Sequence, residues 1–185
     1  MRVVSGSARG KQLLPVPGMD TRPTTDRVKE SIFNIIQMRV RGARVLDLFA
    51  GTGQMGIEAL SRGAARADFV DADRKAADIV RKNLAGARVA DRAQVHQTDF
   101  KKYLAGCPRQ GFDLVFLDPP YGGKLLQSAL FEIQRFDILS PDGIIVCESA
   151  VVDKWESPFA CGREYRYGAI RVTVLAAGTP PKTPE

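Results

Sequence analysis

From residue 44 onward, short apolar runs alternate with stretches of helical periodicity, and this alternation constrains the fold more than any other feature. The apolar runs that predict strands are 44–49, 67–72, 93–97, 112–117 and 143–149. The patterns that predict helices between them are 53–63, 74–86, 99–105 and 125–136. Strands that are joined through helices form a mostly parallel, doubly wound sheet, so the predicted class is α/β with helices on both faces.

The N-terminal residues form a separate extension in this prediction. Short apolar pieces broken by glycine and proline predict a small hairpin that pairs about 2–5 with 11–14. Residues 21–36 then place apolar side chains on one helical face, and Thr24 or Thr25 can cap that helix. The expected organisation is an extension, an α/β domain and a disordered tail, with bounds 1–37, 38–177 and 178–185.

The C-terminal segment breaks the alternation of strand and helix. Residues 163–177 predict two strands joined at Gly168, with no helix between them. Two strands joined in this way run in opposite directions. The segment therefore predicts an antiparallel hairpin at the end of an otherwise parallel sheet.

Composition limits the function without naming it. No apolar run approaches the length of a membrane span and no apolar signal region opens the chain, so a cytoplasmic protein with no membrane contact is expected. Three scattered cysteines and one histidine are a poor set of metal ligands, so no metal is expected. A net charge of +6 favours a polyanionic partner. No exposed apolar helix stands out, which favours a monomer.

A glycine-rich turn follows the first predicted strand. Gly51, Gly53 and Gly56 have GxGxxG spacing between a strand and a helix, where glycine lets the backbone approach a ligand closely. Asp71 ends the second strand, where a carboxylate can accept both ribose hydroxyls of an adenosine. Asp99, after the third strand, can accept from an adenine amino group. An adenosine-containing ligand is therefore expected at this edge of the sheet.

Asp47, at the tip of the first strand, favours one of two such ligands. A dinucleotide such as NAD would place its pyrophosphate on the following helix N-terminus, close to this acid and repelled by it. S-adenosylmethionine would instead place its sulfonium and ammonium groups there, and the carboxylate would attract both. The acids favour S-adenosylmethionine, while an NAD-dependent oxidoreductase stays as an alternative that a cofactor titration would separate.

The fourth predicted strand ends in the turn Asp118-Pro119-Pro120-Tyr121. Ligands of open α/β sheets bind outside the carboxyl ends of the strands, so this turn faces the same crevice as Asp47. The Asp118 carboxylate and the Pro119 carbonyl can accept the N–H groups of a planar exocyclic amine, and the prolines hold both acceptors in place before reaction. Tyr121 can stack on the base. The turn therefore predicts methyl transfer to an exocyclic amine of a nucleobase.

At these motifs the chain resembles a known family. VLDLFAGTGQMGIEAL and LDPPY resemble the cofactor and catalytic motifs of class I S-adenosylmethionine-dependent methyltransferases that act on exocyclic amines. RPTTDRVKESIFNII, with SGSARGKQL before it, resembles the bacterial RsmD family, and the resemblance spans residues 1 to about 176. It implies a seven-stranded Rossmann-like domain with a small N-terminal extension. It also implies transfer of one methyl group to N2 of guanine-966 of 16S ribosomal RNA, within the small-subunit ribonucleoprotein.

The resemblance also assigns roles to positions of this chain. The positions that would hold the cofactor are Asp47, Phe49, Gly51, Gly53, Asp71 and Asp99. The catalytic positions, which would hold the guanine, are Asp118, Pro119, Pro120 and Tyr121. The positions that would border the crevice and meet RNA or cofactor are Arg22, Thr24, Thr25 and Arg27. Separately, an excess of basic over acidic residues in the first thirty predicts an RNA-docking arm that includes Arg9 and Lys11.

Two other functions stay open at this point. An adenine-N6 methyltransferase on DNA or RNA would share every catalytic residue, because the base pocket cannot be seen in the sequence. A non-catalytic nucleic-acid-binding relative would keep the fold, although the intact motif from Asp118 to Tyr121 argues against it. Relatives in the family that the chain resembles often carry other residues where Gly122 and Gly123 follow this motif, so a mobile loop over the base is expected.

Overall fold

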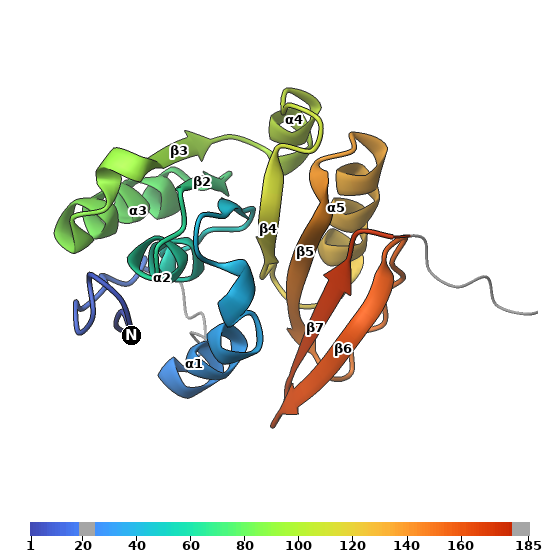
Figure 1. The fold of residues 1–185 in the computed structure, drawn as a ribbon, viewed down its shortest axis with the longest axis horizontal. Coiled ribbons are helices and arrows are strands. Elements are labelled where there is room, and N and C mark those ends of the chain that lie inside the picture. The colour runs from blue at the N-terminus through green and yellow to red at the C-terminus, as the bar shows by residue number, and fades with distance from the viewer. Residues whose placement is uncertain (19–24, 179–185) are drawn as a thin grey trace, which may run out of the picture.

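A seven-stranded sheet with the order β3-β2-β1-β4-β5-β7-β6 runs through the structure (Figure 1). The computed structural model describes residues 1–18 and 25–178. The strands are β1 (Arg44–Asp47), β2 (Arg66–Asp71), β3 (Ala93–Gln97), β4 (Phe112–Leu117), β5 (Leu139–Ala150), β6 (Ala160–Tyr167) and β7 (Ile170–Ala176). The pairs among β1 to β5 are parallel, whereas β7 runs antiparallel to both β5 and β6. The predicted sheet with its C-terminal hairpin is confirmed.

Helices cover both faces of this sheet. They are α1 (Asp26–Ile35), α2 (Gln54–Ser61), α3 (Arg74–Ala87), α4 (Phe100–Ala105) and α5 (Lys124–Arg135). Two 3-10 turns, Gln37–Arg39 and Ala90–Arg92, lie between these elements. The first three helices pack on one face and the last two on the other (Figure 1). Across residues 1–18 and 25–178, every helix is too short or too polar to cross a membrane.

Alternation along each strand decides which face a side chain joins. Val45 and Leu114 point into the core under α1, α2 and α3, while Leu46 and Val115 point into the core under α4 and α5. Because both faces are covered, the central strands are apolar on both sides, as expected for parallel sheets. The sheet therefore has two cores, one on each side.

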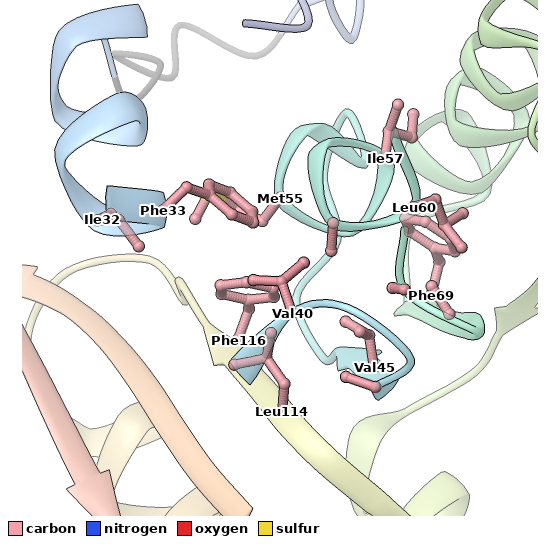
Figure 2. Packing of buried hydrophobic residues seen from close by; sticks show 14 of the residues in the cluster. Ile32, Phe33, Val40, Val45, Met55, Ile57, Leu60, Phe69, Leu114 and Phe116 are labelled. Atoms are coloured by element: carbon pink, nitrogen blue, oxygen red, sulfur yellow. The ribbon is translucent and has the colours of Figure 1, made fainter. Parts of the chain in front are cut away.

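Helix α1 belongs to the same core as the sheet. Its Phe33 ring lies 5.6 Å from the ring of Phe116 on β4, and Met55 of α2 packs beside them (Figure 2). Thr25 caps α1, since its side chain accepts a hydrogen bond from the Val28 N–H, as predicted. Phe33 is fully buried, so truncating it to alanine would cost about 3–5 kcal/mol.

The N-terminal segment is held against α2 by a buried carboxylate. Glu58 accepts hydrogen bonds from the N–H of Val4 at 2.7 Å and of Ser5 at 2.9 Å. Lys29 of α1 is also fully buried, and its ammonium lies 3.8 Å from Glu58 and donates to the carbonyl of Arg2. A buried charge is tolerated only when it is paired in this way.

The same contacts explain why the predicted N-terminal hairpin is confined to one bridge. The bridge joins Arg2 to Gln12. Beyond it, the N–H groups of Val4 and Ser5 bond to Glu58 instead of to a strand partner. The chain then turns at Gly6, where φ is +85°. The expected pairing of 2–5 with 11–14 is therefore present but short.

The strand order reverses between β1 and β4, because β2 and β3 lie on one side of β1 while β4 and β5 lie on the other. At such a point the loops that follow the two strands leave in opposite directions. They open a crevice outside the carboxyl ends of the strands. The turns after β1 and β4 are the glycine-rich turn and the Asp118–Tyr121 turn.

Candidate active site at the carboxyl ends of the strands

Two carboxyl groups are neighbours where β4 and β5 reach the crevice. The parallel register pairs Leu117 of β4 with Cys147 of β5. The next residues, Asp118 and Glu148, are therefore side by side across strands about 4.8 Å apart. Glu148 is only 6% exposed, and its neighbourhood to Asp118 was not predicted from the sequence.

Asp47 completes a row with these two acids. Asp47 pairs with Phe116 in the register of β1 and β4, and Asp118 lies two residues after Phe116 on the same face. Glu148 continues the side of β5 that faces α1 and α2. We call Asp47, Asp118 and Glu148 the acid row.

Burial and neighbouring negative charge raise the pKa values of Asp47 and Asp118. Asp47 is 3% exposed, and burial raises its pKa to about 7 despite a 3.0 Å hydrogen bond from the Gly56 N–H. The pKa of Asp118 lies well above its usual range, first because of burial and then because Glu148 and Asp47 are close. A cation placed beside this row would relieve the cost of its negative charge.

The glycine-rich turn has the tight geometry that its spacing predicts. Gly51 and Gly53 have φ of +54° and +78°, in the left-handed region that favours glycine. A Cβ on Gly56 would lie 2.3 Å from the ring of Phe69 on β2, so only glycine lets α2 approach the sheet this closely. The turn therefore brings backbone N–H groups and the N-terminus of α2 to the crevice.

Asp71 and Asp99 stand at the ends of β2 and β3. Asp71 accepts the N–H of Gly51 through one oxygen and the N–H of Asp73 through the other, each at 2.9 Å. These bonds orient the carboxylate and leave each oxygen a second lone pair for a ligand. Asp99 caps α4 by accepting the Lys101 N–H at 2.9 Å, a role that leaves its second oxygen available.

Aromatic and amide side chains support this half of the crevice. Phe49 packs on Phe100 with ring centroids 5.3 Å apart, which places it beside the start of α4. Asn83 of α3 donates to the carbonyls of Thr52 and Leu14, at 2.9 and 3.1 Å, and accepts from the Leu14 N–H at 2.7 Å. Asn83 thus fixes the glycine-rich turn to the N-terminal segment. A helical asparagine gave no signal of this role in the sequence.

The turn after β4 presents its aromatic ring to solvent. Tyr121 is 53% exposed, while Pro119 is buried. The two glycines that follow differ, because Gly123 is buried while Gly122 is exposed and has open space around it. The Gly122 N–H donates to Asp153 at 3.1 Å, and a Cβ on Gly123 would lie 2.5 Å from the backbone oxygen of Lys154. Gly123 thus permits a close approach of the loop after β5, and the mobility of the loop over the base stays a prediction.

The predicted RNA-binding residues are not all brought together. Thr25 and Arg27 stand at the exposed start of α1. Arg9 and Lys11 are exposed too, but their turn lies elsewhere, over the C-terminal ends of α2 and α3.

Two contacts place this turn. The Ser7 N–H bonds to the Ser61 carbonyl at the end of α2, and a Cβ on Gly86 of α3 would lie 2.8 Å from Lys11 Cε. Arg22 and Thr24 lie outside the described residues.

The donor set of the crevice fits S-adenosylmethionine. Asp47 offers a buried carboxylate that needs a cation, the glycine-rich turn offers close backbone contact, and Asp71 offers oriented acceptors. Among residues 1–18 and 25–178, no three His, Cys, Asp or Glu side chains are grouped so that they could hold a metal ion.

The chain is similar in sequence to known proteins over most of its length. The family model described as "Conserved hypothetical protein 95" matches residues 1–176. The chain is 48% identical over 150 residues to YlbH of Bacillus subtilis, covering 80% of this chain and 82% of YlbH. It is 38% identical over 154 residues to Ribosomal RNA small subunit methyltransferase D of Escherichia coli strain K12, covering 82% of this chain and 75% of that protein.

A solved structure extends the likeness over nearly the whole chain. The Escherichia coli protein yhhF superposes with a TM-score of 0.83 and 34% identity, covering 97% of this chain and 98% of that one. The matched span includes the glycine-rich turn, the turn from Asp118 to Tyr121 and the N-terminal segment that packs on α2. The chain therefore belongs to the RsmD family.

Proposed function

We propose that this protein transfers a methyl group from S-adenosylmethionine to the N2 amine of a guanine in 16S ribosomal RNA, the base at position 966. The observation that carries the proposal is the placement of Asp118 on the same face and edge of the sheet as Asp47. A cofactor held by Asp47 and an amine held by Asp118 would meet in one crevice. The name of the Escherichia coli relative supports the class of RNA.

Asp47, Asp71 and the glycine-rich turn would hold the cofactor. The Asp47 carboxylate would pair with its cationic amino-acid end, and this pairing would offset the burial that raises the pKa of Asp47. Asp71, oriented by the N–H groups of Gly51 and Asp73, would accept the ribose hydroxyls. Phe49 and Asp99 would border the adenine. When bound, S-adenosylmethionine supplies a methyl group on a positively charged sulfur.

The turn from Asp118 to Tyr121 would prepare the amine. The lone pair of the guanine N2 is delocalised into the ring, so the free amine is a poor nucleophile. Asp118 and the Pro119 carbonyl would accept its two N–H groups and favour a pyramidal nitrogen, while Pro120 would keep the turn rigid. Tyr121, half-exposed at the rim, would stack on the extruded base.

Transfer is then a displacement in which the nitrogen lone pair forms the new N–C bond. The methyl–sulfur bond would break as the new bond forms, and its electron pair would stay on the sulfur. The nitrogen would lose one proton, which the Asp118 carboxylate that holds the amine would take. A carboxyl with a raised pKa takes a proton more readily than an ordinary one, so the surroundings of Asp118 suit that task. Proximity of amine and methyl supplies much of the acceleration.

Basic residues outside the crevice would position the RNA. Arg27 and Thr25 stand at the start of α1, and Arg22 and Thr24 precede them in the chain. Arg9 and Lys11, on the turn over α2 and α3, would contact phosphates of the same RNA farther from the target base. The substrate would be RNA within a small-subunit ribonucleoprotein, bound by a monomer in the cytoplasm.

The test is methyl transfer from labelled S-adenosylmethionine, followed by identification of the product nucleoside. The acceptors are small ribosomal subunits that lack their own modification, protein-free 16S RNA and duplex DNA. N2-methylguanosine at one position of ribosomal RNA is the expected product. N6-methyladenosine would show that the base is wrong, and no transfer to any acceptor would contradict the proposal.

Replacement of Asp118 separates chemistry from cofactor binding. The change Asp118→Ala should lower the rate of methyl transfer by about 10³-fold, because the amine loses its charged acceptor. The affinity for S-adenosylmethionine, measured by calorimetry, should stay within about threefold of the wild-type value. Asp91→Ala, at an exposed site in the 3-10 turn Ala90–Arg92, is the matched control and should keep both quantities. Turnover close to wild type in Asp118→Ala would remove Asp118 from the mechanism.

A further inference from the structure

A second cavity lies against the C-terminal hairpin, outside the crevice described above. Its volume is about 360 Å³, which is in the size range of sites for small molecules. Thr173 of β7 and Glu164 of β6 line it and are paired in the register of the two strands. Residues 153–157, between β5 and β6, line it as well. The mechanism above gives no role to the side chains of this cavity.

The hydroxyl of Thr173 is a buried polar group that the fold itself does not satisfy. Thr173 is only 2% exposed, and within residues 1–18 and 25–178 its hydroxyl has no hydrogen-bond partner. Alternation along β7 sets Thr173 between Arg171 and Leu175 on the face that lines the cavity. Burying a hydroxyl without a hydrogen bond is unfavourable, and a ligand that bonded it would remove that cost. The cavity therefore favours a ligand with polar atoms.

Two planar side chains at the cavity are held in place by the protein. The guanidinium of Arg171 lies 5.4 Å from the centroid of the Trp155 ring. Arg171 Nε donates to the Ser149 hydroxyl at 3.2 Å, and the Trp155 indole N–H donates to the same oxygen at 3.3 Å. Arg171 also donates to the carbonyl of Asp153. Nucleobases stack on aromatic rings and on guanidinium planes of this kind.

The charges of the lining favour a neutral ligand over an anion. Two acids and two bases line the cavity, namely Asp153, Glu164, Lys154 and Arg171. Such a balanced set gives a free phosphate no net attraction. A flat stacking surface with hydrogen-bond donors and acceptors beside it fits a nucleobase, which has planar rings and a polar edge.

The cavity is joined to the turn that would hold the target base. The Asp153 carboxylate accepts the Gly122 N–H at 3.1 Å and the Ala150 N–H at 3.2 Å. Gly122 directly follows Tyr121, so residues 153–157 pack beside the end of the turn after β4. When a base is extruded from its stack, the next nucleotide stays attached to it through one phosphodiester. A neighbouring nucleotide is therefore the part of the RNA that this cavity can meet.

We propose that this cavity binds the base of a nucleotide that flanks the methylated guanine. The base stacks on Trp155 and Arg171, and its edge forms a hydrogen bond with the Thr173 hydroxyl. This inference rests on the proposed function, because it names a second part of the substrate that the same enzyme holds. Binding of a neighbouring base fixes the register of the RNA strand, so the correct guanine reaches Asp118.

Two variants of Thr173 separate its hydroxyl from its shape. Thr173→Val removes the hydroxyl and keeps the branched shape, whereas Thr173→Ser keeps the hydroxyl and loses a methyl group. Without RNA, Thr173→Val should melt at or above the wild-type temperature and Thr173→Ser below it. For methyl transfer the order should reverse. The kcat/KM of Thr173→Val should fall about 5–10-fold, while Thr173→Ser should stay within about twofold of wild type.

RNA that lacks one base identifies the partner of the hydroxyl. The substrates are small subunits reconstituted with 16S RNA in which each nucleotide flanking the methylated guanine is made abasic in turn. At one of these positions the wild-type kcat/KM should fall about tenfold or more, because stacking is lost. On that RNA Thr173→Val should match the wild type, since the hydroxyl has no base to bond in either case.

The outcomes separate this inference from the proposed function. A loss in Thr173→Val that disappears on one abasic RNA, and that Thr173→Ser does not share, supports the inference. Equal kcat/KM of Thr173→Val and wild type on intact RNA overturns it, as does the same loss on every abasic RNA. The inference is also overturned if no abasic position matters, if Thr173→Ser loses as much as Thr173→Val, or if Thr173→Val melts well below wild type.

These contrary results leave the proposed function intact, because N2-methylguanosine is still formed. The affinity for S-adenosylmethionine should be the same in both variants as in the wild type, and a change would overturn the assignment of the cavity to RNA. Failure of the wild type to form N2-methylguanosine contradicts the proposed function and this inference together.

Discussion

Asp47 shows how a single buried acid links cofactor binding to stability. Its pKa of about 7 in the cofactor-free fold means that the folded protein keeps a proton that the unfolded chain releases near pH 4. The stability contributed by this proton is full below about pH 4 and is lost as the pH rises to about 7. Without a bound cation beside Asp47, the folded protein is therefore less stable near pH 7 than near pH 4.

The pH dependence of unfolding tests this reading of Asp47. Between pH 5 and pH 8 the cofactor-free wild type should lose on the order of 2–3 kcal/mol of unfolding free energy through this residue. Asp47→Asn removes the titrating group. The unfolding free energy of the variant relative to the wild type should therefore rise by that amount between pH 5 and pH 8. Urea unfolding at several pH values measures both. A difference between variant and wild type that does not change with pH would rule out the assignment.

The individual residues of the site were predictable to different degrees. Asp47, Asp71 and Asp118 end apolar runs, and an acid in that position is conspicuous in a sequence. Glu148 also ends an apolar run, but its meaning depends on the register that places it beside Asp118. Asn83 carries no local signal, because its partners Leu14 and Thr52 are far away in the sequence. A contact between distant segments leaves no pattern within either segment, so neither segment's sequence predicts it.

Among the elements, helices and strands were predicted to within a few residues except where turn-like residues lie inside a strand. β5 begins at Leu139, four residues before the predicted start at 143. The intervening Ser140-Pro-Asp-Gly143 reads as a turn, yet Phe112 pairs with Leu139 and the register shifts between Phe112 and Leu114. An irregularity of this kind lets a proline and a glycine sit within a strand.

The turn from Ser5 to Gly10 offers a test of how the N-terminal segment docks on α2. Gly6 and Gly10 have nearly equal φ, +85° and +82°, so alanine is similarly strained at both. A Cβ on Gly6 would lie 1.9 Å from the Ser61 carbonyl oxygen, whereas Gly10 has open space. Gly6→Ala should therefore cost about 2–3 kcal/mol more than Gly10→Ala.

Thermal or urea unfolding of the two glycine variants measures this difference. Gly10→Ala is the matched control for backbone strain, and it should cost about 1 kcal/mol. Equal losses in the two variants would show that the segment does not rest on the end of α2 in solution. That result would contradict the close contact between the N-terminal segment and α2 that the hydrogen bond from the Ser7 N–H to the Ser61 carbonyl indicates.

Over the molecule as a whole, the net charge of +6 would attract RNA at long range. The crevice would contact the target base only at short range. Arg9 and Lys11 lie over the ends of α2 and α3, away from the acid row, so an RNA that met both regions would extend across the face of the protein. Phosphate contacts of this kind orient the RNA without reading its sequence.

Salt dependence of RNA binding tests the docking arm. Replacing both Arg9 and Lys11 with glutamine should weaken binding and reduce the slope of log K against log salt by about 1.4, if each contacts one phosphate. The paired control is Arg109→Gln with Arg135→Gln, two exposed arginines, of which the first lies on the loop before β4 and the second at the end of α5. An unchanged slope in the Arg9 and Lys11 variant would exclude these residues from the interface.

The buried Glu58 has a consequence for how the chain is made. Its partners, the N–H groups of Val4 and Ser5, lie more than fifty residues earlier in the sequence. During synthesis the first residues therefore leave the ribosome long before α2, which carries Glu58. Their N–H groups can form these hydrogen bonds only after α2 has been synthesised and folded. The amides of Val4 and Ser5 should accordingly gain protection from hydrogen exchange late on the nascent chain, together with α2.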